Sequence, residues 1–472
     1  MPFFKLSSYA IVKKYFLFKN VFMKVIIIGA VAAGSKTAMK LKRLKPYWDI
    51  VIYTSDEEVS YSACGLPYYI AGSIKDVETL IIRKSSKYAE FGIDVNLRHL
   101  VKSINPDKKE ITIENLDTKN VFTDIYDKLV IATGAEPFVP DIKGVNLGNV
   151  FTLRTLKDGE NVKKAVLQSK KAVILGCGYI GIELLEAFVK QGLMVTVIQS
   201  SDTIMPIFDK DLSEIIQKYV VQKHLEQIKI INNATICSIE GEENKVKKVI
   251  TTTGKEIKTD MVVLSVGVRP NVQFAVNAGI KLGVTGAIKV NSKMETNIKD
   301  IYACGDCVEK YHAVADVPCW IPLGSTANKE GRCCAINVSG VIDNFEGVLG
   351  SAVTRYFDFT MSMTGLTEKQ AIKYGFEPIS VVVRKNDKAS YMPDVESIII
   401  KLTADKNSQR ILGAQGLGQG DVDKRINALT SALLSKMTIK EFFGNDMTYA
   451  PPFSTSIDPM LTAAQHLMSK FD

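Results

Sequence analysis

A single cysteine, Cys64, has the setting in this 472-residue sequence that most clearly favours chemistry. It lies in the stretch EEVSYSACGLPYYIAG, residues 57–72, three residues before Pro67. Proline suits the first turn of a helix, so the pattern places Cys64 near a helix N-terminus. There the helix dipole and the free backbone amides favour the thiolate, which is the nucleophilic form of cysteine. We therefore predict a reactive thiol at position 64.

A glycine-rich turn follows the first apolar segment that has a clear period. KVIII at residues 24–28 is a short β-prone run, GAVAAG at 29–34 follows directly, and the next residues show apolar side chains at helical spacing. Gly29 and Gly34 match the first and last glycines of a dinucleotide fingerprint, with Val31 where the second glycine is usual. This order predicts a strand, a tight turn and a helix whose N-terminal amides could bind a pyrophosphate.

A second copy of this pattern is complete. KAVIL at residues 171–175 precedes GCGYIG at 176–181, which an apolar helical segment and the β-prone run MVTVI follow. All three fingerprint glycines, Gly176, Gly178 and Gly181, are present. Glycine turns in an ordinary α/β sheet would explain one copy, but they explain two copies with matching flanks poorly. The sequence therefore predicts two bound dinucleotides.

Three further stretches distinguish a flavoenzyme from an ordinary dehydrogenase. KLVIATGAEPFVP (128–140) and VVLSVGVRPN (262–271) are predicted to be strands that end in glycine turns and cross between two nucleotide-binding domains. TNIKDIYACGDCVE (296–309) places Asp306 just after a strand and Gly305, where a carboxylate can accept hydrogen bonds from a polyol chain. With this motif the sequence resembles the flavoprotein disulfide reductases over essentially everything after residue 23. In that family the aspartate of the motif holds the ribityl chain of FAD.

The other seven cysteines are expected to be inert, because most cysteines are small buried apolar residues. Cys304 and Cys307 form a CxxC pair that could indicate a thioredoxin-like or metal site. Their two middle residues already belong to the flavin motif, and no second pair lies at zinc spacing, so we predict no metal site. The remaining cysteines are Cys177, Cys237, Cys319, Cys333 and Cys334.

The stretch around Cys64 resembles one branch of the family. Members that reduce glutathione disulfide or lipoamide use two cysteines separated by four residues, whereas the residue five beyond Cys64 is Tyr69. SYSACGLPYYIAG resembles the single-cysteine branch, which contains coenzyme A disulfide reductases, CoA persulfide or polysulfide reductases, and NADH oxidases and peroxidases. The resemblance implies that Cys64 is a redox centre, which cycles as a mixed disulfide with a substrate thiol or as a sulfenic acid.

Two observations favour the mixed disulfide with CoA. In the resembling oxidases and peroxidases a histidine of the first glycine loop assists peroxide chemistry, and the matching residue is Ala32. In the resembling CoA disulfide reductases the partner subunit supplies two tyrosines, which match Tyr391 in ASYMPD and Tyr449 in MTYAPPFS. A phenol can protonate a departing CoA thiolate, although ordinary interface aromatics are the alternative. The alternative function is an NADH oxidase or peroxidase that uses Cys64 as a sulfenic acid.

Basic residues near the first glycine turn could bind the phosphates of CoA. Arg43 matches an arginine that contacts CoA in the resembling enzymes, and Lys40 lies three residues before it on roughly the same helix face. Lys84 and Lys87 could extend the patch, but solvated surface lysines are the more ordinary interpretation of these two. Ser60 is included among the candidate residues for both CoA and FAD.

The residues expected at the two adenosine riboses depart from the family pattern. Thr54 stands where an acid would bind the ribose of FAD, and Asp56 or Glu57 could substitute for it. Gln199 stands at the matching position of the second unit, which lacks both the acid that selects NADH and the adjacent arginine that selects NADPH. The choice between NADH and NADPH therefore stays open.

The resemblance implies a full set of cofactors and cofactor-binding residues. The cofactors are FAD, NADH or NADPH, and coenzyme A as a mixed disulfide on Cys64. Tyr179 and Glu183 match residues that border the nicotinamide and gate its access to the flavin. The predicted cofactor-binding residues are Gly29, Val31, Ala32, Gly34, Thr54, Ser60, Thr133, Gly134, Gly305, Asp306, Gly176, Gly178, Tyr179, Gly181, Glu183, Gln199 and Gly267.

Composition excludes several other classes of protein. With 46% hydrophobic and 23% charged residues, the chain has the balance of a soluble globular protein of two or three domains. A formal net charge of +8 is too small and too dispersed to predict nucleic-acid binding, although it suits an anionic small molecule. No apolar run approaches the roughly 18 residues of a membrane-spanning helix. Eight scattered cysteines indicate reduced thiols and a cytoplasmic location.

The predicted fold is α/β, with two Rossmann-like domains for FAD and NAD(P) and a C-terminal α+β dimerisation domain. Residues 1–22 are predicted to be an extension outside the fold, with a weak membrane-surface segment as the alternative. The family's dimerisation domain implies a homodimer, in which Tyr391 and Tyr449 reach Cys64 of the partner subunit. The predicted boundaries are 23–142 for the first part of the FAD domain, 143–270 for the NAD(P) domain, 271–347 for the second part of the FAD domain and 348–472 for the dimerisation domain.

Overall fold

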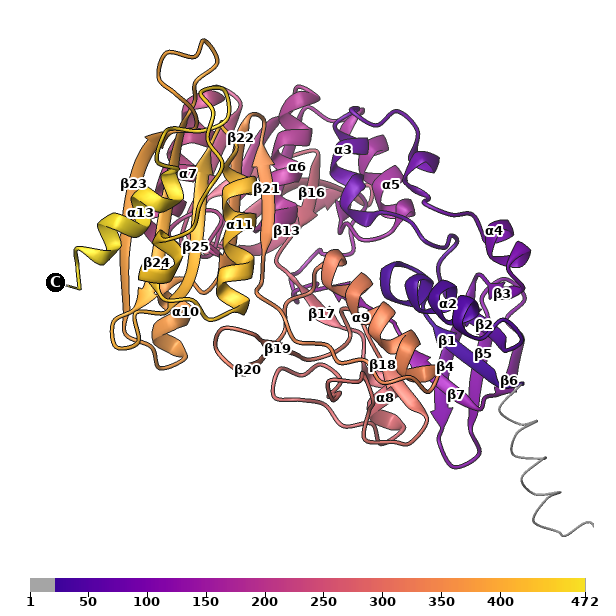
Figure 1. Ribbon diagram of the computed structural model, residues 1–472. Helices are drawn as coiled ribbons and strands as arrows, with labels where there is room; N and C mark the ends of the chain where they lie inside the picture. Colours follow the sequence, from indigo (N-terminus) through magenta and orange to yellow (C-terminus); the bar gives the residue numbers. More distant parts are fainter. Residues whose placement is uncertain (1–21, 472) are drawn as a thin grey trace, which may run out of the picture.

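The described part of the chain runs from residue 22 to residue 471 in a computed structural model, shown in Figure 1. All but the last residue of the predicted N-terminal extension, residues 1–22, therefore lies outside the described residues. Within residues 22–471, no helix is both long enough and apolar enough to cross a membrane. All eight cysteines carry free thiols.

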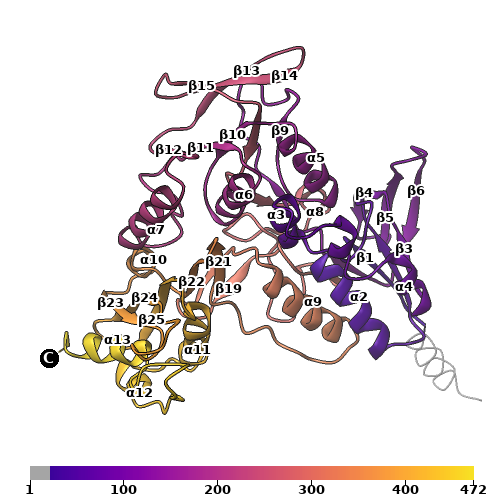
Figure 2. The ribbon, with the colours of Figure 1, turned by 90° about the horizontal axis from the view of Figure 1, so that it is seen from above.

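The first sheet is parallel and is built from two distant parts of the chain. Its strand order is β18-β7-β1-β2-β3, so a strand near residue 300 completes a sheet formed by the N-terminal segments. Helices α2 and α9 pack against each other over one face of this sheet (Figure 2). The bounds are β1 Lys24–Ile28, β2 Asp49–Tyr53, β3 Ile93–Asn96, β7 Lys128–Ile131, β18 Ile301–Ala303, α2 Ala32–Leu44 and α9 Gly324–Val338.

Alternate side chains of this sheet enter two separate cores. Val25 and Ile27 pack beneath α2 and α9, whereas Ile26 and Ile28 pack against an antiparallel three-stranded sheet on the other face. Burial on both faces explains why β1 is an unbroken apolar run. The elements on the second face are β4 His99–Asn105, β5 Glu110–Asn115, β6 Val121–Ile125 and α8 Gln273–Asn277.

A second parallel sheet, of order β12-β11-β10-β16-β9, repeats this architecture. It also carries an antiparallel three-stranded sheet, β13-β14-β15, on one side. The bounds of the sheet strands are β9 Val150–Phe151, β10 Lys171–Leu175, β11 Met194–Ile198, β12 Ile228–Ile231 and β16 Met261–Leu264. The other elements are α5 Leu156–Val166, α6 Tyr179–Lys190, α7 Lys210–Lys223, β13 Ile236–Glu242, β14 Lys245–Thr251 and β15 Glu256–Lys258.

The two crossovers between these units are tied together. Strands β8, Ala135–Pro137, and β17, Val268–Pro270, pair in antiparallel fashion. The Thr133 hydroxyl donates to the Asn271 carbonyl oxygen at 2.8 Å, and Gly267 adopts a φ of +105° in the returning crossover. Other short elements are α3 Leu66–Ile70, α4 Ser85–Glu90, β19 Lys310–His312 and β20 Val317–Cys319.

The C-terminal segment forms an antiparallel sheet of order β21-β22-β25-β24-β23, on the left of Figure 1. Helices α11 and α13 pack on this sheet and bury its apolar face. The buried Lys401 ammonium lies 3.2 Å from Asp209, which joins this domain to the second unit. The bounds are β21 Ala352–Tyr356, β22 Phe359–Gly365, β23 Pro378–Asn386, β24 Ser397–Asp405, β25 Ile411–Gly418, α10 Glu368–Lys373, α11 Val422–Leu434, α12 Ile439–Phe443 and α13 Pro459–Met468.

The predicted fold, two Rossmann-like units followed by a C-terminal α+β domain, is confirmed. Both strand, glycine turn and helix sequences occur where the apolar periodicity places them, as β1 with α2 and as β10 with α6. The exact domain boundaries at residues 142, 270 and 347 stay predictions.

Candidate functional site

Cys64 lies at the start of a short helix, as its neighbours predict. It is the middle residue of a 3₁₀ turn, Ala63–Gly65, which leads into α3 with Pro67 in the first helical turn. The turn packs closely against Leu80, because a Cβ atom on Gly65 would lie 2.3 Å from the Leu80 Cδ2 atom. Cys64 itself is exposed. The loop therefore presents the thiol at the surface of the chain while its backbone is held in place.

The charges around the Cys64 thiol come from three distant parts of the chain. Although Cys64 is exposed to solvent, the protein around it partly desolvates the sulfur, and this desolvation raises the thiol pKa. The carboxylates of Glu183 and Asp306 raise it further, while the Arg154 guanidinium lowers it. The net effect is a thiol pKa above the ordinary value. The expectation that the helix terminus would lower this pKa is therefore wrong for the protein groups taken alone, because desolvation and the two acids outweigh it.

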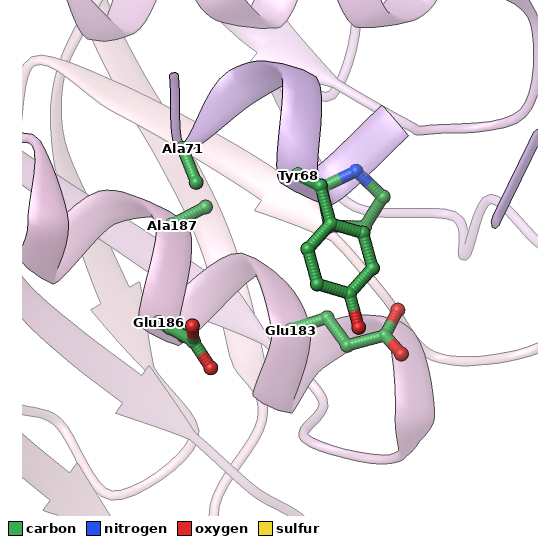
Figure 3. A pocket seen from close by; sticks show the side chains of 6 residues that line it. Tyr68, Ala71, Glu183, Glu186 and Ala187 are labelled. Atoms are coloured by element: carbon green, nitrogen blue, oxygen red, sulfur yellow. The ribbon is translucent and has the colours of Figure 1, made fainter. Parts of the chain in front are cut away.

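Glu183 projects from helix α6 toward the segment that carries Cys64. Its Oε1 atom accepts a 3.1 Å hydrogen bond from the Thr354 hydroxyl on strand β21. Burial raises the pKa of Glu183 to about 7, so the carboxyl group is partly protonated at neutral pH. In Figure 3 the Tyr68 ring extends from α3 toward the Glu183 side chain of α6. They line a small pocket between α3 and α6, whose lining is Pro67, Tyr68, Ala71, Glu183, Glu186 and Ala187.

The first glycine turn has the shape that a dinucleotide needs. Gly29 has a φ of +101°, and a Cβ atom on it would lie 2.3 Å from the Ala132 carbonyl oxygen. A Cβ atom on Gly34 would lie 1.9 Å from the Gly29 oxygen, so both positions require glycine. Helix α2 begins at Ala32, directly after Val31, and no side chain caps its N-terminus. Its first amides are therefore available to an anion.

Asp306 presents a buried carboxylate oxygen to the same region. Gly305 before it has a φ of +89°, and a Cβ atom on Gly305 would lie 2.8 Å from the Ala33 Cβ atom, so this turn lies beside α2. The Oδ1 atom of Asp306 is buried without a hydrogen-bond partner among the described residues. Because such an oxygen is costly, it marks a place where a ligand hydroxyl would bind. The residues present thus fit a dinucleotide with a polyol chain, as FAD has.

Arg154 is a candidate that sequence reasoning missed. Its Nη2 atom lies 3.2 Å from the Asp306 Oδ2 atom, and a Cβ atom on Gly134 would lie 3.1 Å from the same nitrogen. Its backbone N–H donates to Asp158, which forms a capping box with Thr155 at the start of α5. The spacing of Thr155 and Asp158 could have predicted the helix start. No local pattern indicates that the preceding arginine reaches the Asp306 turn.

The predicted substitutes for the missing ribose acid already have protein partners. Asp56 accepts a hydrogen bond from the Tyr61 hydroxyl at 3.3 Å, and Glu57 pairs with Arg98 at 3.8 Å. Thr54 is buried at the end of β2, and its Oγ1 atom accepts from the Asp56 N–H at 3.3 Å. Which of these residues would contact the ribose of FAD stays a prediction.

Ser60 connects the first glycine turn to the loop after the cysteine segment. Its N–H donates to the Ala30 carbonyl oxygen at 2.9 Å, and its own carbonyl accepts from the Ile82 N–H at 2.8 Å. It is buried with a φ of +56°, which residues other than glycine rarely adopt. Such a strained backbone persists only where its surroundings fix it, so Ser60 is a rigid part of the site.

The second glycine turn resembles the first in its close backbone contact, and it has free space beside Gly178. A Cβ atom on Gly181 would lie 2.3 Å from the Gly176 oxygen, whereas the Cβ position of Gly178 has nothing within 4 Å. Helix α6 begins at Tyr179 without a side-chain cap. The backbone at Gly178 is therefore open to a pyrophosphate.

Gln199 is buried and uses its amide group inside the protein. Its Oε1 atom accepts from the Cys177 N–H at 2.8 Å, and its Nε2 atom donates to the Ser201 Oγ atom at 2.7 Å. Ser201 in turn donates to the Thr203 carbonyl oxygen at 2.8 Å. This position therefore braces the glycine turn and offers no carboxylate to a ribose.

Tyr391 and Tyr449 lie together on the C-terminal domain. Both are exposed, by 73% and 50% respectively. Partial desolvation and a hydrogen bond with Tyr449 raise the pKa of Tyr391. The loops that carry them are joined where the Ala389 N–H donates to the Pro451 carbonyl oxygen at 3.2 Å. The structure thus brings these two predicted residues together on an open face.

The predicted CoA-binding cations are less specifically placed. Lys84 pairs with Glu78 at 2.8 Å and Lys87 with Glu90 at 2.6 Å, all at exposed positions. Such pairs are what the ordinary interpretation of these lysines predicts. On α2, Lys40 is half-buried and Arg43 is exposed. A role for any of the four in CoA binding stays a prediction.

Comparison with known proteins gives the family. The profile described as "Pyridine nucleotide-disulphide oxidoreductase" matches residues 23–331, and the profile of the dimerisation domain of these enzymes matches residues 351–461. With two dinucleotide turns, an unpaired Asp306 oxygen and an exposed Cys64 beside them, the chain belongs to the pyridine nucleotide-disulphide oxidoreductase family.

Several relatives are similar over nearly their whole length. The NAD(P)H sulfur oxidoreductase (CoA-dependent) of Pyrococcus furiosus is 35% identical over 94% of this chain and 99% of that protein. The NADH oxidase of Methanocaldococcus jannaschii is 36% identical, with 95% and 99% covered, and the coenzyme A disulfide reductase of Staphylococcus aureus is 30% identical, with 91% and 96% covered. The crystal structure of reduced Bacillus anthracis CoADR-RHD superposes with a TM-score of 0.92 at 33% identity, covering 95% of this chain and 81% of that chain.

The family confirms the predicted class of enzyme. The chain is an NAD(P)H-dependent flavoprotein oxidoreductase similar to coenzyme A disulfide reductase. FAD and NAD(P)H as cofactors follow from the family, and the dimerisation domain indicates a homodimer.

Proposed function

We propose that this enzyme uses NAD(P)H and FAD to reduce CoA disulfide, or a CoA persulfide or polysulfide, through a mixed disulfide between CoA and Cys64. One observation carries this proposal. The exposed Cys64 thiol interacts electrostatically with Glu183 of the second dinucleotide unit and with Asp306 of the first, and both carboxylates raise its pKa. A sulfur at this junction can receive electrons from a flavin and can meet a large thiol substrate from solvent.

Cys64 carries the bond-making step. Its thiolate attacks one sulfur of the CoA disulfide, which forms the Cys64–CoA disulfide and expels the other CoA as a thiolate. FAD, held by the first glycine turn and Asp306, would supply the two electrons of NAD(P)H to this mixed disulfide. Reduction would break the Cys64–CoA bond, release the second CoA and restore the Cys64 thiolate. In total, NAD(P)H, one proton and CoA disulfide give NAD(P)⁺ and two CoA thiols.

The phenols of Tyr391 and Tyr449 supply the proton for the departing CoA thiolate. Tyr449 raises the pKa of Tyr391, and both phenols are exposed, so a ligand on a facing surface could reach them. A phenol has a pKa of about 10, close to the roughly 8.5 of an alkyl thiol, so it can donate a hydrogen bond or a proton to a departing thiolate. In this proposal the tyrosines act on the Cys64 site of the partner subunit. Arg43 and Lys40 bind phosphates of CoA.

The mass of the intact protein tests this proposal. Protein purified without reductant should lose one CoA moiety when dithiothreitol is added, and a peptide map should place that loss on Cys64. Finding only one or two added oxygen atoms on Cys64 would contradict the mixed disulfide. It would favour the second candidate, an NADH oxidase or peroxidase with a sulfenic acid, which the M. jannaschii relative brings into consideration.

Substitution of the cysteine gives an independent test. Cys64→Ser should reduce CoA disulfide turnover by more than 100-fold, as expected when a nucleophile is removed. FAD should stay bound, because Cys64 is not among the residues that fit the dinucleotide. The control is Cys237→Ser, since Cys237 is the other exposed cysteine and lies on strand β13. Most of the wild-type rate in Cys64→Ser, or a similar loss in both variants, would refute the assignment.

A further inference from the structure

A fully buried ion pair lies directly behind the turn that carries Asp306. Lys310 opens strand β19 and Glu330 lies in the middle of helix α9. Both side chains are 0% exposed, and the Lys310 Nζ atom lies 3.4 Å from the Glu330 Oε1 atom. Neither residue belongs to a recognisable sequence motif. A buried charge pair is costly to form, so its position calls for a physical reason.

The pair holds the two peptide groups on either side of Gly305. The Glu330 Oε2 atom accepts from the Gly305 N–H at 2.8 Å, and the Lys310 Nζ atom donates to the Gly305 carbonyl oxygen at 2.9 Å. Lys310 also donates to the Val308 carbonyl oxygen at 3.2 Å. The left-handed conformation of Gly305, with a φ of +89°, is therefore fixed by charged partners on both sides.

This arrangement determines where the next side chain points. The backbone oxygen of Asp306 accepts from the Trp320 Nε1 atom at 2.8 Å, so the backbone on both sides of the Asp306 side chain is fixed. One carboxylate oxygen, Oδ2, meets Arg154, and the other, Oδ1, is buried without a partner among the described residues. A small rotation of the backbone at Gly305 would move this free oxygen away from the first glycine turn.

We propose that Lys310 and Glu330 are positioning residues for FAD. By holding the backbone N–H and carbonyl groups of Gly305, they keep the free Asp306 oxygen aimed at a hydroxyl of the flavin polyol chain. The ammonium of Lys310 and the carboxyl group of Glu330 are strong hydrogen-bond partners for the backbone on the two sides of Gly305. This inference concerns flavin retention and is independent of the CoA substrate proposed above.

Two double variants separate the hydrogen bonds from the charges. Lys310→Gln with Glu330→Gln removes both charges but keeps a donor for the Gly305 oxygen and an acceptor for the Gly305 N–H. Lys310→Met with Glu330→Met keeps similar volume and removes the hydrogen bonds as well. We expect the double glutamine variant to release FAD within about threefold of the wild-type rate, and the double methionine variant to release it at least 10-fold faster.

The measurement is the rate of flavin release from the diluted holoenzyme, followed by free-flavin fluorescence, together with circular dichroism to establish folding. Tyr311→Phe, at the exposed next residue of β19, is the control. If the double methionine variant does not fold, Lys310→Gln with Glu330→Met replaces it and removes only the acceptor for Gly305. The proposal would be overturned if the double glutamine variant and the methionine-containing variant released FAD at the same rate, whether that rate is slow or fast.

Discussion

At the scale of single residues, Glu183 is the group whose ionisation most directly affects the proposed site. It contributes to the raised pKa of Cys64, and its own pKa is raised to about 7 by burial. Thr354 holds its Oε1 atom at 3.1 Å, so the carboxyl group keeps its place in either protonation state. Near neutral pH, deprotonation of Glu183 would therefore raise the pKa of the Cys64 thiol further.

This raised pKa has a consequence for stability. In an unfolded chain Glu183 would titrate near 4.5, and in the native protein near 7, so between these values the native state binds more protons than the unfolded state. The contribution of Glu183 to the free energy of unfolding is largest below pH 4.5 and is lost as the pH rises through 7. Glu183→Gln should therefore stabilise the protein by about 1–3 kcal/mol at pH 8 and by much less at pH 5.

Urea unfolding at pH 5 and pH 8 checks this prediction, with Glu226→Gln as the control because Glu226 is exposed on a loop. The control should change stability by less than about 0.5 kcal/mol at either pH. A Glu183→Gln variant that is less stable than wild type at pH 8 would show that the carboxylate is not an unfavourable buried charge.

At the scale of secondary-structure elements, the contact between α2 and α9 sets the geometry of the flavin site. A Cβ atom on Gly331 of α9 would lie 2.5 Å from the Ala33 carbonyl oxygen in the first turn of α2. The same helix α9 carries Glu330, and α2 offers its free N-terminal amides to a pyrophosphate. One close helix contact therefore positions both the pyrophosphate amides and the clamp behind Asp306.

Gly331→Ala should push the two helices apart. We expect a loss of about 1–3 kcal/mol in unfolding free energy, typical of overpacking, together with a lower flavin content after purification. Gly324→Ala is the matched control on the same helix, because nothing lies within 4 Å of its Cβ position. Flavin absorbance per protein and urea unfolding measure both effects. Equal behaviour of the two variants would show that the contact does not matter.

The elements themselves were predictable from sequence, whereas their charged contacts were not. β1 with its glycine turn, the second fingerprint and the strand before Asp306 follow from short-range patterns, because turn chemistry and apolar period are local. The raised pKa of Cys64 was missed, since Glu183 and Asp306 reach it from far along the chain. Arg154, too, is brought to Asp306 only by the tertiary fold.

At the scale of the whole molecule, the C-terminal domain presents an exposed apolar face around the two tyrosines. Phe453 is 73% exposed and Ile457 is 51% exposed on the loop that follows Tyr449. Exposed apolar clusters of this kind usually mark an interface. Arg425 is buried beneath these loops, where its Nη2 atom donates to the Asp387 carbonyl oxygen at 2.5 Å and its Nε atom lies 3.2 Å from Asp458. Arg425 thus ties the segments that flank both tyrosine loops to the domain beneath them.

If Tyr391 and Tyr449 serve the partner subunit's Cys64, two inactive proteins should restore each other. A Cys64→Ser homodimer lacks the nucleophile, and a Tyr391→Phe, Tyr449→Phe homodimer lacks both phenols. In a mixed dimer, one of the two sites would combine an intact Cys64 with intact tyrosines from the other chain. Differently tagged chains, co-expressed and purified as the mixed dimer, should therefore reduce CoA disulfide at about half the wild-type rate. If the tyrosines act within their own chain, neither site is complete, and the mixed dimer should be no more active than the average of its two parents.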